Sequence, residues 1–232
     1  MICCASSPSV CRASEPPPPK RSSAKPDKEA FSNRQTTRTH PMPTLPKVML
    51  LGDSIRMSYE AQVADLLRGR AQVVSPAVNG QHTLYTLASL NQWFEELGEP
   101  DIVHWNNGLH DIGHNPARYP VQFPLEMYVA NLTFILERLL EVTPKVTWAT
   151  MTPVHPDRPF VDTEYSWRNE EIDRNNAAAR ALMESRDVPV NDLHAVVWAD
   201  RDAFLAEDQI HLSEAGEQAC AQAVADAVAR WL

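Results

Sequence analysis

The chain has 232 residues, of which 44% are hydrophobic and 22% charged, and its formal net charge is -9 at pH 7. This composition is typical of a globular protein with a substantial core, and no apolar run is long enough to cross a bilayer. The negative charge argues against a nucleic-acid partner and does not favour binding to anionic membranes.

Residues 1–45 differ in composition from the rest of the chain. They hold eight of the nineteen prolines, and seven basic against three acidic residues. Such a segment cannot bury enough apolar surface to order itself, so we predict a disordered Pro/Ser-rich basic tail over residues 1–45 and one folded domain over residues 46–232. The first ten residues lack the apolar centre of a signal peptide, which predicts a cytoplasmic location and leaves organelle targeting by the basic tail open.

From residue 47 onward, stretches typical of strands alternate with stretches typical of helices. We predict strands over 47–52, 71–77, 101–105, 145–150 and 188–190, and helices over 57–69, 84–97, 125–141, 168–186 and 213–231. This alternation predicts an α/β three-layer sandwich with a five-stranded parallel sheet. In such sheets ligands bind beyond the carboxyl ends of the strands, and Gly52, Gly80 and Gly108 follow the first three predicted strands there.

The first predicted strand runs directly into Gly52-Asp53-Ser54, which places a serine at a strand-to-helix turn. A serine hydroxyl is a poor nucleophile until a base takes its proton and a third group orients that base. Asp208 and His211 precede the last predicted helix at a three-residue offset, which lets both face the same edge of the sheet. The alternative is that Ser54 caps a helix and His211 is an ordinary surface histidine.

These residues together resemble the SGNH (GDSL) hydrolase family, whose fold is flavodoxin-like. The resemblance covers essentially residues 47–232. It implies that Ser54 is the nucleophile, that His211 takes the serine's proton, and that Asp208 orients His211. It also implies that the backbone N–H groups of Ser54 and Gly80 help to form the oxyanion hole.

One block departs from the family pattern. The usual form is Gly-x-Asn-Asp, with the Asn side chain donating to the oxyanion, whereas this chain has Gly108-Leu109-His110-Asp111. Because an imidazole can donate an N–H, His110 is a candidate for that duty, and Asn107 or Asn106 just upstream are alternatives. The segment around this block also resembles a subset of the family assigned to carbohydrate ester cleavage.

Other polar and aromatic residues admit further roles. His110 and His114 would form a metal pair only on one face of a helix, and Gly108 and Gly113 argue against a helix there, so we predict no metal and no cofactor. The loop over residues 152–158 follows the fourth predicted strand on the active edge and is a candidate pocket wall. Four tryptophans are candidates for a sugar-stacking surface or for the core: Trp105, Trp148, Trp167 and Trp198.

We therefore predict a serine esterase that removes acetyl or another small acyl group from a carbohydrate or similar hydroxylated substrate. The same chemistry on a lipid or thioester is one alternative, since the family includes lysophospholipases and thioesterases. A binding protein without catalysis on the same fold is the other, and the histidine at position 110 is the feature that favours it. The predicted partner is a small-molecule or carbohydrate ester, with the oligomeric state left open.

Overall fold

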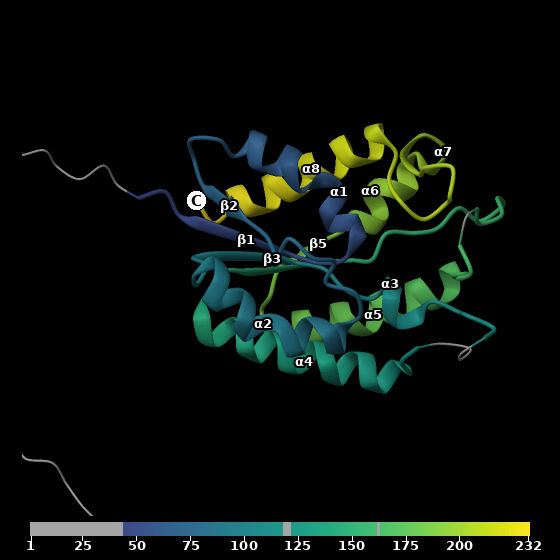
Figure 1. Ribbon diagram of the computed structural model, residues 1–232, viewed down its shortest axis with the longest axis horizontal. Helices are drawn as coiled ribbons and strands as arrows, with labels where there is room; N and C mark the ends of the chain where they lie inside the picture. Colours follow the sequence, from purple (N-terminus) through teal and green to yellow (C-terminus); the bar gives the residue numbers. More distant parts are fainter. Residues whose placement is uncertain (1–43, 118–121, 162) are drawn as a thin grey trace, which may run out of the picture. The chain divides into compact units, whose positions relative to one another are not determined.

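The computed structural model describes residues 44–117, 122–161 and 163–232 (Figure 1). The predicted tail over residues 1–45 falls outside these residues except at its last two positions. The elements follow the chain as β1 (Lys47–Leu51), α1 (Ser54–Leu66), β2 (Gln72–Val74), α2 (Thr83–Leu97), β3 (Ile102–Trp105), α3 (Leu109–Ile112), α4 (Leu125–Val142), β4 (Val146–Ala149), α5 (Asn169–Glu184), β5 (Val190–Asn191), α6 (Leu193–Ala199), α7 (Arg201–Phe204) and α8 (Glu214–Ala229).

The five strands form one parallel sheet in the order β2-β1-β3-β4-β5, which confirms the predicted fold class. In the register of β1 with β3, Leu51 pairs with Trp105. The segments that leave these two strands therefore start side by side. This adjacency brings Gly52-Asp53-Ser54 next to the segment that carries His110.

Helices cover both faces of the sheet. Figure 1 shows α1, α6 and α8 on one face, and α2, α4 and α5 on the other. Strands β1, β3 and β4 are apolar along nearly their whole length because both of their faces are covered, and residues 48–51, 102–105 and 146–149 are buried. Within the described residues, no helix is long and apolar enough to cross a membrane.

Three short helices depart from the sequence-based prediction. Helix α3 spans only Leu109–Ile112 and ends at Gly113, so His110 and His114 share no helical face. Helices α6 and α7 occupy a stretch for which no element was predicted. The Asp192 side chain accepts the N–H of Ala195 at 3.1 Å and caps α6, and this aspartate was a readable helix-start signal.

Candidate active site

Ser54 is the first residue of α1, three residues beyond the end of β1. Asp53 caps this helix by accepting the N–H of Ile55 at 3.0 Å. The turn packs closely against the end of the neighbouring strand β3, since a Cβ on Gly52 would lie 2.0 Å from the side-chain oxygen of Asn106. The close approach requires glycine, and it sets the direction in which Ser54 leaves the sheet.

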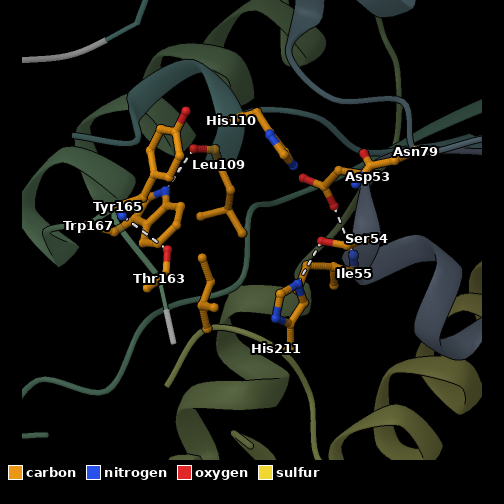
Figure 2. A pocket seen from close by; sticks show the side chains of 11 residues that line it. Asp53, Ser54, Ile55, Asn79, Leu109, His110, Thr163, Tyr165, Trp167 and His211 are labelled. Carbon is orange, nitrogen blue, oxygen red and sulfur yellow. Dashed lines mark hydrogen bonds between the residues drawn. The ribbon is translucent and has the colours of Figure 1, made fainter. Parts of the chain in front are cut away.

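Ser54, His211 and Asp208 form a continuous hydrogen-bonded chain. Nε2 of His211 lies 2.9 Å from Oγ of Ser54 (Figure 2). Nδ1 of the same ring lies 2.5 Å from Oδ2 of Asp208. The other oxygen of Asp208 accepts the backbone N–H groups of Ile210 and His211 at 3.1 and 2.9 Å. The imidazole is thus held between a hydroxyl and a carboxylate, the geometry in which it can take the hydroxyl proton.

The loop that carries Asp208 and His211 is closed on itself. An isolated antiparallel bridge joins Leu205 to Leu212, and the N–H of Ala206 donates to the carbonyl of His211 at 2.8 Å. Partial burial acts to raise the pKa of Asp208, but hydrogen bonds from the His211 ring and from backbone N–H groups hold that pKa below its usual value. Asp208 is consequently ionised at neutral pH.

Three of the groups expected near the oxyanion take different positions. The N–H of Gly80 donates to the carbonyl of Gly52 at 2.9 Å. The Asn107 amide donates to the carbonyl of Gln81 at 2.9 Å and accepts the indole N–H of Trp105 at 2.6 Å. His110, in contrast, lines the same pocket as Ser54 and His211.

Asp53 and Asp111 are buried carboxylates beside this pocket. Burial raises the pKa of Asp111 to about 7, although hydrogen bonds from the hydroxyl and N–H of Thr83 act in the opposite direction. Burial also raises the pKa of Asp53, and the positive charge of His110 is the largest influence that lowers it. Both aspartates hold the backbone around them in place, since Asp53 accepts the N–H of Ile55 and Asp111 accepts the hydroxyl of Thr83.

The pocket has a volume of about 340 Å³ and two unlike sides. Figure 2 shows Ser54 and His211 on one side, and Thr163, Tyr165 and Trp167 on the other. Tyr165 and Trp167 are stacked with ring centroids 6.0 Å apart. The aromatic wall formed by these two residues faces the space in front of Ser54.

The sequence predicted only part of this aromatic wall. Trp167 was one of four tryptophan candidates, whereas Trp105 and Trp148 are fully buried in the sheet. The loop over residues 152–158 contributes none of the residues that line the pocket. Its His155 instead lies 3.1 Å from Asp202 of α7.

The described residues contain no group of three or more His, Cys, Asp or Glu side chains that could hold a metal ion. His114, which the sequence offered as a ligand, pairs instead with Glu171 of α5.

A model of the GDSL-like lipase/acylhydrolase family matches residues 50–219. Among solved structures, an α/β hydrolase from the metagenome of Lake Arreo, Spain, is similar with a TM-score of 0.67 at 20% identity, over 80% of this chain and 96% of that one. The lipase/acylhydrolase of Enterococcus faecalis is similar with a TM-score of 0.62 at 20% identity, over 79% and 95% of the two chains. The acetylxylan esterase of Geobacillus stearothermophilus has a TM-score of 0.62 at 19% identity, over 80% and 94%. No curated protein matches the sequence.

Proposed function

Since this chain belongs to the GDSL-like lipase/acylhydrolase family and is a carboxylic ester hydrolase, we propose that Ser54, His211 and Asp208 are its catalytic triad. The observation that carries the proposal is the unbroken chain of contacts from Ser54 Oγ through the His211 ring to Asp208. The chain of contacts opens into the pocket, where an ester can reach the hydroxyl.

The reaction proceeds in two halves. Ser54 Oγ attacks the ester carbonyl carbon while Nε2 of His211 takes the hydroxyl proton, and Asp208 stabilises the resulting imidazolium. The tetrahedral intermediate collapses as His211 returns the proton to the leaving alcohol. A water molecule, deprotonated by His211, then attacks the acyl group on Ser54, and the acid is released with the serine restored.

The oxyanion of the intermediate needs hydrogen-bond donors in front of Ser54. The N–H of Ser54 is one, because the first residue of a helix has no intrahelical acceptor. For the side-chain donor we propose His110 in preference to Asn107. Two observations support this choice, namely the position of His110 in the pocket lining and the commitment of the Asn107 amide to Gln81. The N–H of Gly80 would have to leave the Gly52 carbonyl before it could join them.

The substrate that we propose is a small acyl ester, acetyl above all, of a carbohydrate or similar hydroxylated compound. The aromatic wall supports a sugar, because aromatic rings present flat apolar faces to the C–H groups of a pyranose and polar edges to its hydroxyls. The volume of about 340 Å³ suits a ligand of modest size. The structural likeness to an acetylxylan esterase points the same way.

Hydrolysis of 4-nitrophenyl acetate, 4-nitrophenyl palmitate and an acetylated xylo-oligosaccharide tests the proposal. We expect the wild-type protein to prefer the acetyl esters, and Ser54→Ala to lower their kcat by about a thousandfold or more. Ser58→Ala is the matched control, since this serine also lies in α1 and donates to the carbonyl of Ile55. Equal rates in wild type and Ser54→Ala would contradict the proposed triad. A preference for 4-nitrophenyl palmitate would contradict the proposed carbohydrate substrate.

A further inference from the structure

The segment that carries the proposed acid and base is contacted by the loop that follows β4. This segment spans residues 205–212, and we call it the His211 loop. The backbone N–H of His155 donates to the carbonyl of Gln209 at 3.3 Å. Gln209 lies between Asp208 and His211 in the chain. The contact therefore falls on the short stretch that sets the spacing of these two side chains.

Gln209 has an unusual backbone conformation. Its φ is +69°, in the left-handed region that residues other than glycine rarely adopt. Such a conformation persists only where surrounding contacts hold it. Within the His211 loop, the N–H of Gln209 donates to the carbonyl of Ala206 at 3.0 Å, and its side-chain amide donates to the carbonyl of Glu207 at 2.6 Å. The N–H of His155 adds a hydrogen bond from outside the loop.

The chain that leads from β4 to His155 is fixed to α5 by two asparagine side chains. Asn176 accepts the N–H of Met151 at 2.9 Å and donates to its carbonyl at 3.0 Å. Asn169 makes the same pair of bonds with Val154, at 3.1 and 2.9 Å. The whole stretch over residues 151–155 is buried. His155 is thus held by the body of the domain and can support a neighbouring loop.

The side chain of His155 makes a second contact, with α7. Its Nδ1 accepts the N–H of Asp157 at 3.1 Å, so the hydrogen of the neutral ring is on Nε2. Nε2 lies 3.1 Å from Oδ1 of Asp202, which is also paired with Arg158. The hydrogen bond from His155 is the largest influence that lowers the pKa of Asp202. The histidine side chain is only 5% exposed, so both of its nitrogens are used in a buried setting.

Helix α7 is joined to the far end of the His211 loop. Ser213, which follows the loop, donates its hydroxyl to the carbonyl of Ala203 at 2.5 Å and its N–H to the carbonyl of Phe204 at 2.9 Å. The two ends of the loop are therefore tied together on α7. His155 consequently reaches the loop in two ways, at its middle through the backbone and at its ends through α7.

We propose that His155 is a positioning residue for His211. Its N–H holds Gln209, and its Nε2–H holds α7 through Asp202, so that the His211 ring stays within reach of the Ser54 hydroxyl. The inference rests on the proposed function, because it concerns how the proposed base is held. It also gives the loop over residues 152–158 a role in the site although it lines no part of the pocket.

The proposed base needs such support. Nε2 of His211 and Oγ of Ser54 lie 2.9 Å apart but come from opposite ends of the domain's sequence (Figure 2). Proton transfer requires that hydrogen-bond distance to be kept. The His211 side chain is 45% exposed, so packing around the ring does not fix its place. Its position depends instead on Asp208 and on the backbone of the His211 loop.

Two substitutions of His155 test the contact with α7 in the full chain. The amide nitrogen of glutamine lies near the position of Nε2 and can still donate to Asp202, whereas asparagine is too short to reach it. With 4-nitrophenyl acetate we expect His155→Asn to lower kcat about tenfold or more and to change KM less than about twofold, because the pocket lining is untouched. His155→Gln should restore kcat to within about threefold of the wild type. Thermal unfolding checks that both variants are folded.

Substitutions of Asp202 test the same contact from the other side. Asp202→Ala removes the acceptor and should lower kcat as His155→Asn does, and the double variant should lose less than about twofold more. Asp202→Asn keeps an oxygen that accepts the His155 N–H and should retain most of the activity. Asp200→Ala is the control, since this exposed aspartate begins α7 without a side-chain capping bond.

Hydrogen exchange provides a readout that does not depend on activity. The N–H of Ala206 donates to the carbonyl of His211 at 2.8 Å, so its exchange reports the closure of the His211 loop. We expect exchange in this loop to be about tenfold faster in His155→Asn than in the wild type, and His155→Gln to stay close to the wild type.

Three results would each overturn the proposal. These are an unchanged kcat in His155→Asn, unchanged exchange in the His211 loop of that variant, and equal losses of kcat in His155→Asn and His155→Gln. Full activity in Ser54→Ala would contradict the proposed function instead. In that case the exchange rates would still decide whether His155 holds the loop.

Discussion

The indole N–H of Trp167 donates to the backbone carbonyl of Leu109 at 2.8 Å. This bond links the aromatic wall to α3, one residue before His110. A second link lies beside it, where His114 and Ser166 exchange backbone hydrogen bonds of 2.9 and 3.0 Å. Hydrogen bonds thus hold the aromatic wall against the segment that carries the proposed oxyanion donor.

Replacement of Trp167 should change substrate binding more than chemistry. In Trp167→Ala the stacking face and the bond to Leu109 are both lost, and we expect KM for an acetylated xylo-oligosaccharide to rise about tenfold, in line with a stacking contribution of 0.5–1.5 kcal/mol and the area lost. Trp167→Phe keeps an aromatic ring, so its KM should lie between those of the wild type and Trp167→Ala. Trp198→Phe is the control, since this tryptophan is stacked on His194 and is outside the pocket lining. Unchanged KM in Trp167→Ala would contradict the sugar-binding role.

Asp208→Asn should lower kcat by about ten-thousand-fold, the scale seen when a triad carboxylate becomes an amide. The amide still accepts backbone N–H groups but no longer stabilises the imidazolium or its working tautomer. Because hydrogen bonds hold the pKa of Asp208 below its usual value despite partial burial, the residue stays ionised and contributes no pH limb near neutrality. Steady-state kinetics from pH 5 to 9 provide the measurement, with the exposed Asp226→Asn as control. A loss of less than about tenfold would argue against the triad.

Gly80→Ala should reduce both stability and activity. An added Cβ would lie 2.5 Å from the carbonyl oxygen of Gly52, so the backbone would have to shift to make room for it. Gly52 lies two residues before Ser54, so the shift displaces the proposed nucleophile. We expect a loss of about 2 kcal/mol or more in unfolding free energy, measured with urea, and a fall in kcat/KM. Gly69→Asn is a suitable comparison, because its position is open and its φ of +77° is one that asparagine tolerates.

The buried Asp111 should make stability depend on pH in an unusual direction. Its folded-state pKa of about 7 lies above the ordinary aspartate value of 3.8, so between these values the folded state keeps a proton that the unfolded chain has released. The contribution is therefore complete below about pH 4 and is lost as pH rises through about 7. Relative to Asp111→Asn, the wild type should lose up to about 4 kcal/mol of unfolding free energy over this interval. An identical pH slope in the two proteins would contradict the assignment.

The strand-helix alternation determined most of the fold, because strands buried on both faces must be continuously apolar. Residues 48–51 show this pattern, residues 102–105 show it except at the buried His104, and both stretches belong to inner strands of the sheet. The short helices were not predicted because they contain too little sequence pattern. Four residues in α3 and four in α7 are too few to display a helical period, and their ends depend on neighbouring loops.

The sequence by itself determined the order and local setting of Ser54, Asp208 and His211, since a serine after a buried strand and an Asp-x-x-His before the last helix are local patterns. Which groups face the pocket depends on the packing of segments that are distant in sequence. The Gly80 N–H donates to Gly52 and the Asn107 amide donates to Gln81, whereas His110 lines the pocket. A donor's direction depends on acceptors that are distant in sequence, and for this reason the oxyanion side of the site and its aromatic wall depended on the tertiary structure, whereas the three residues proposed as the triad were predicted from local patterns.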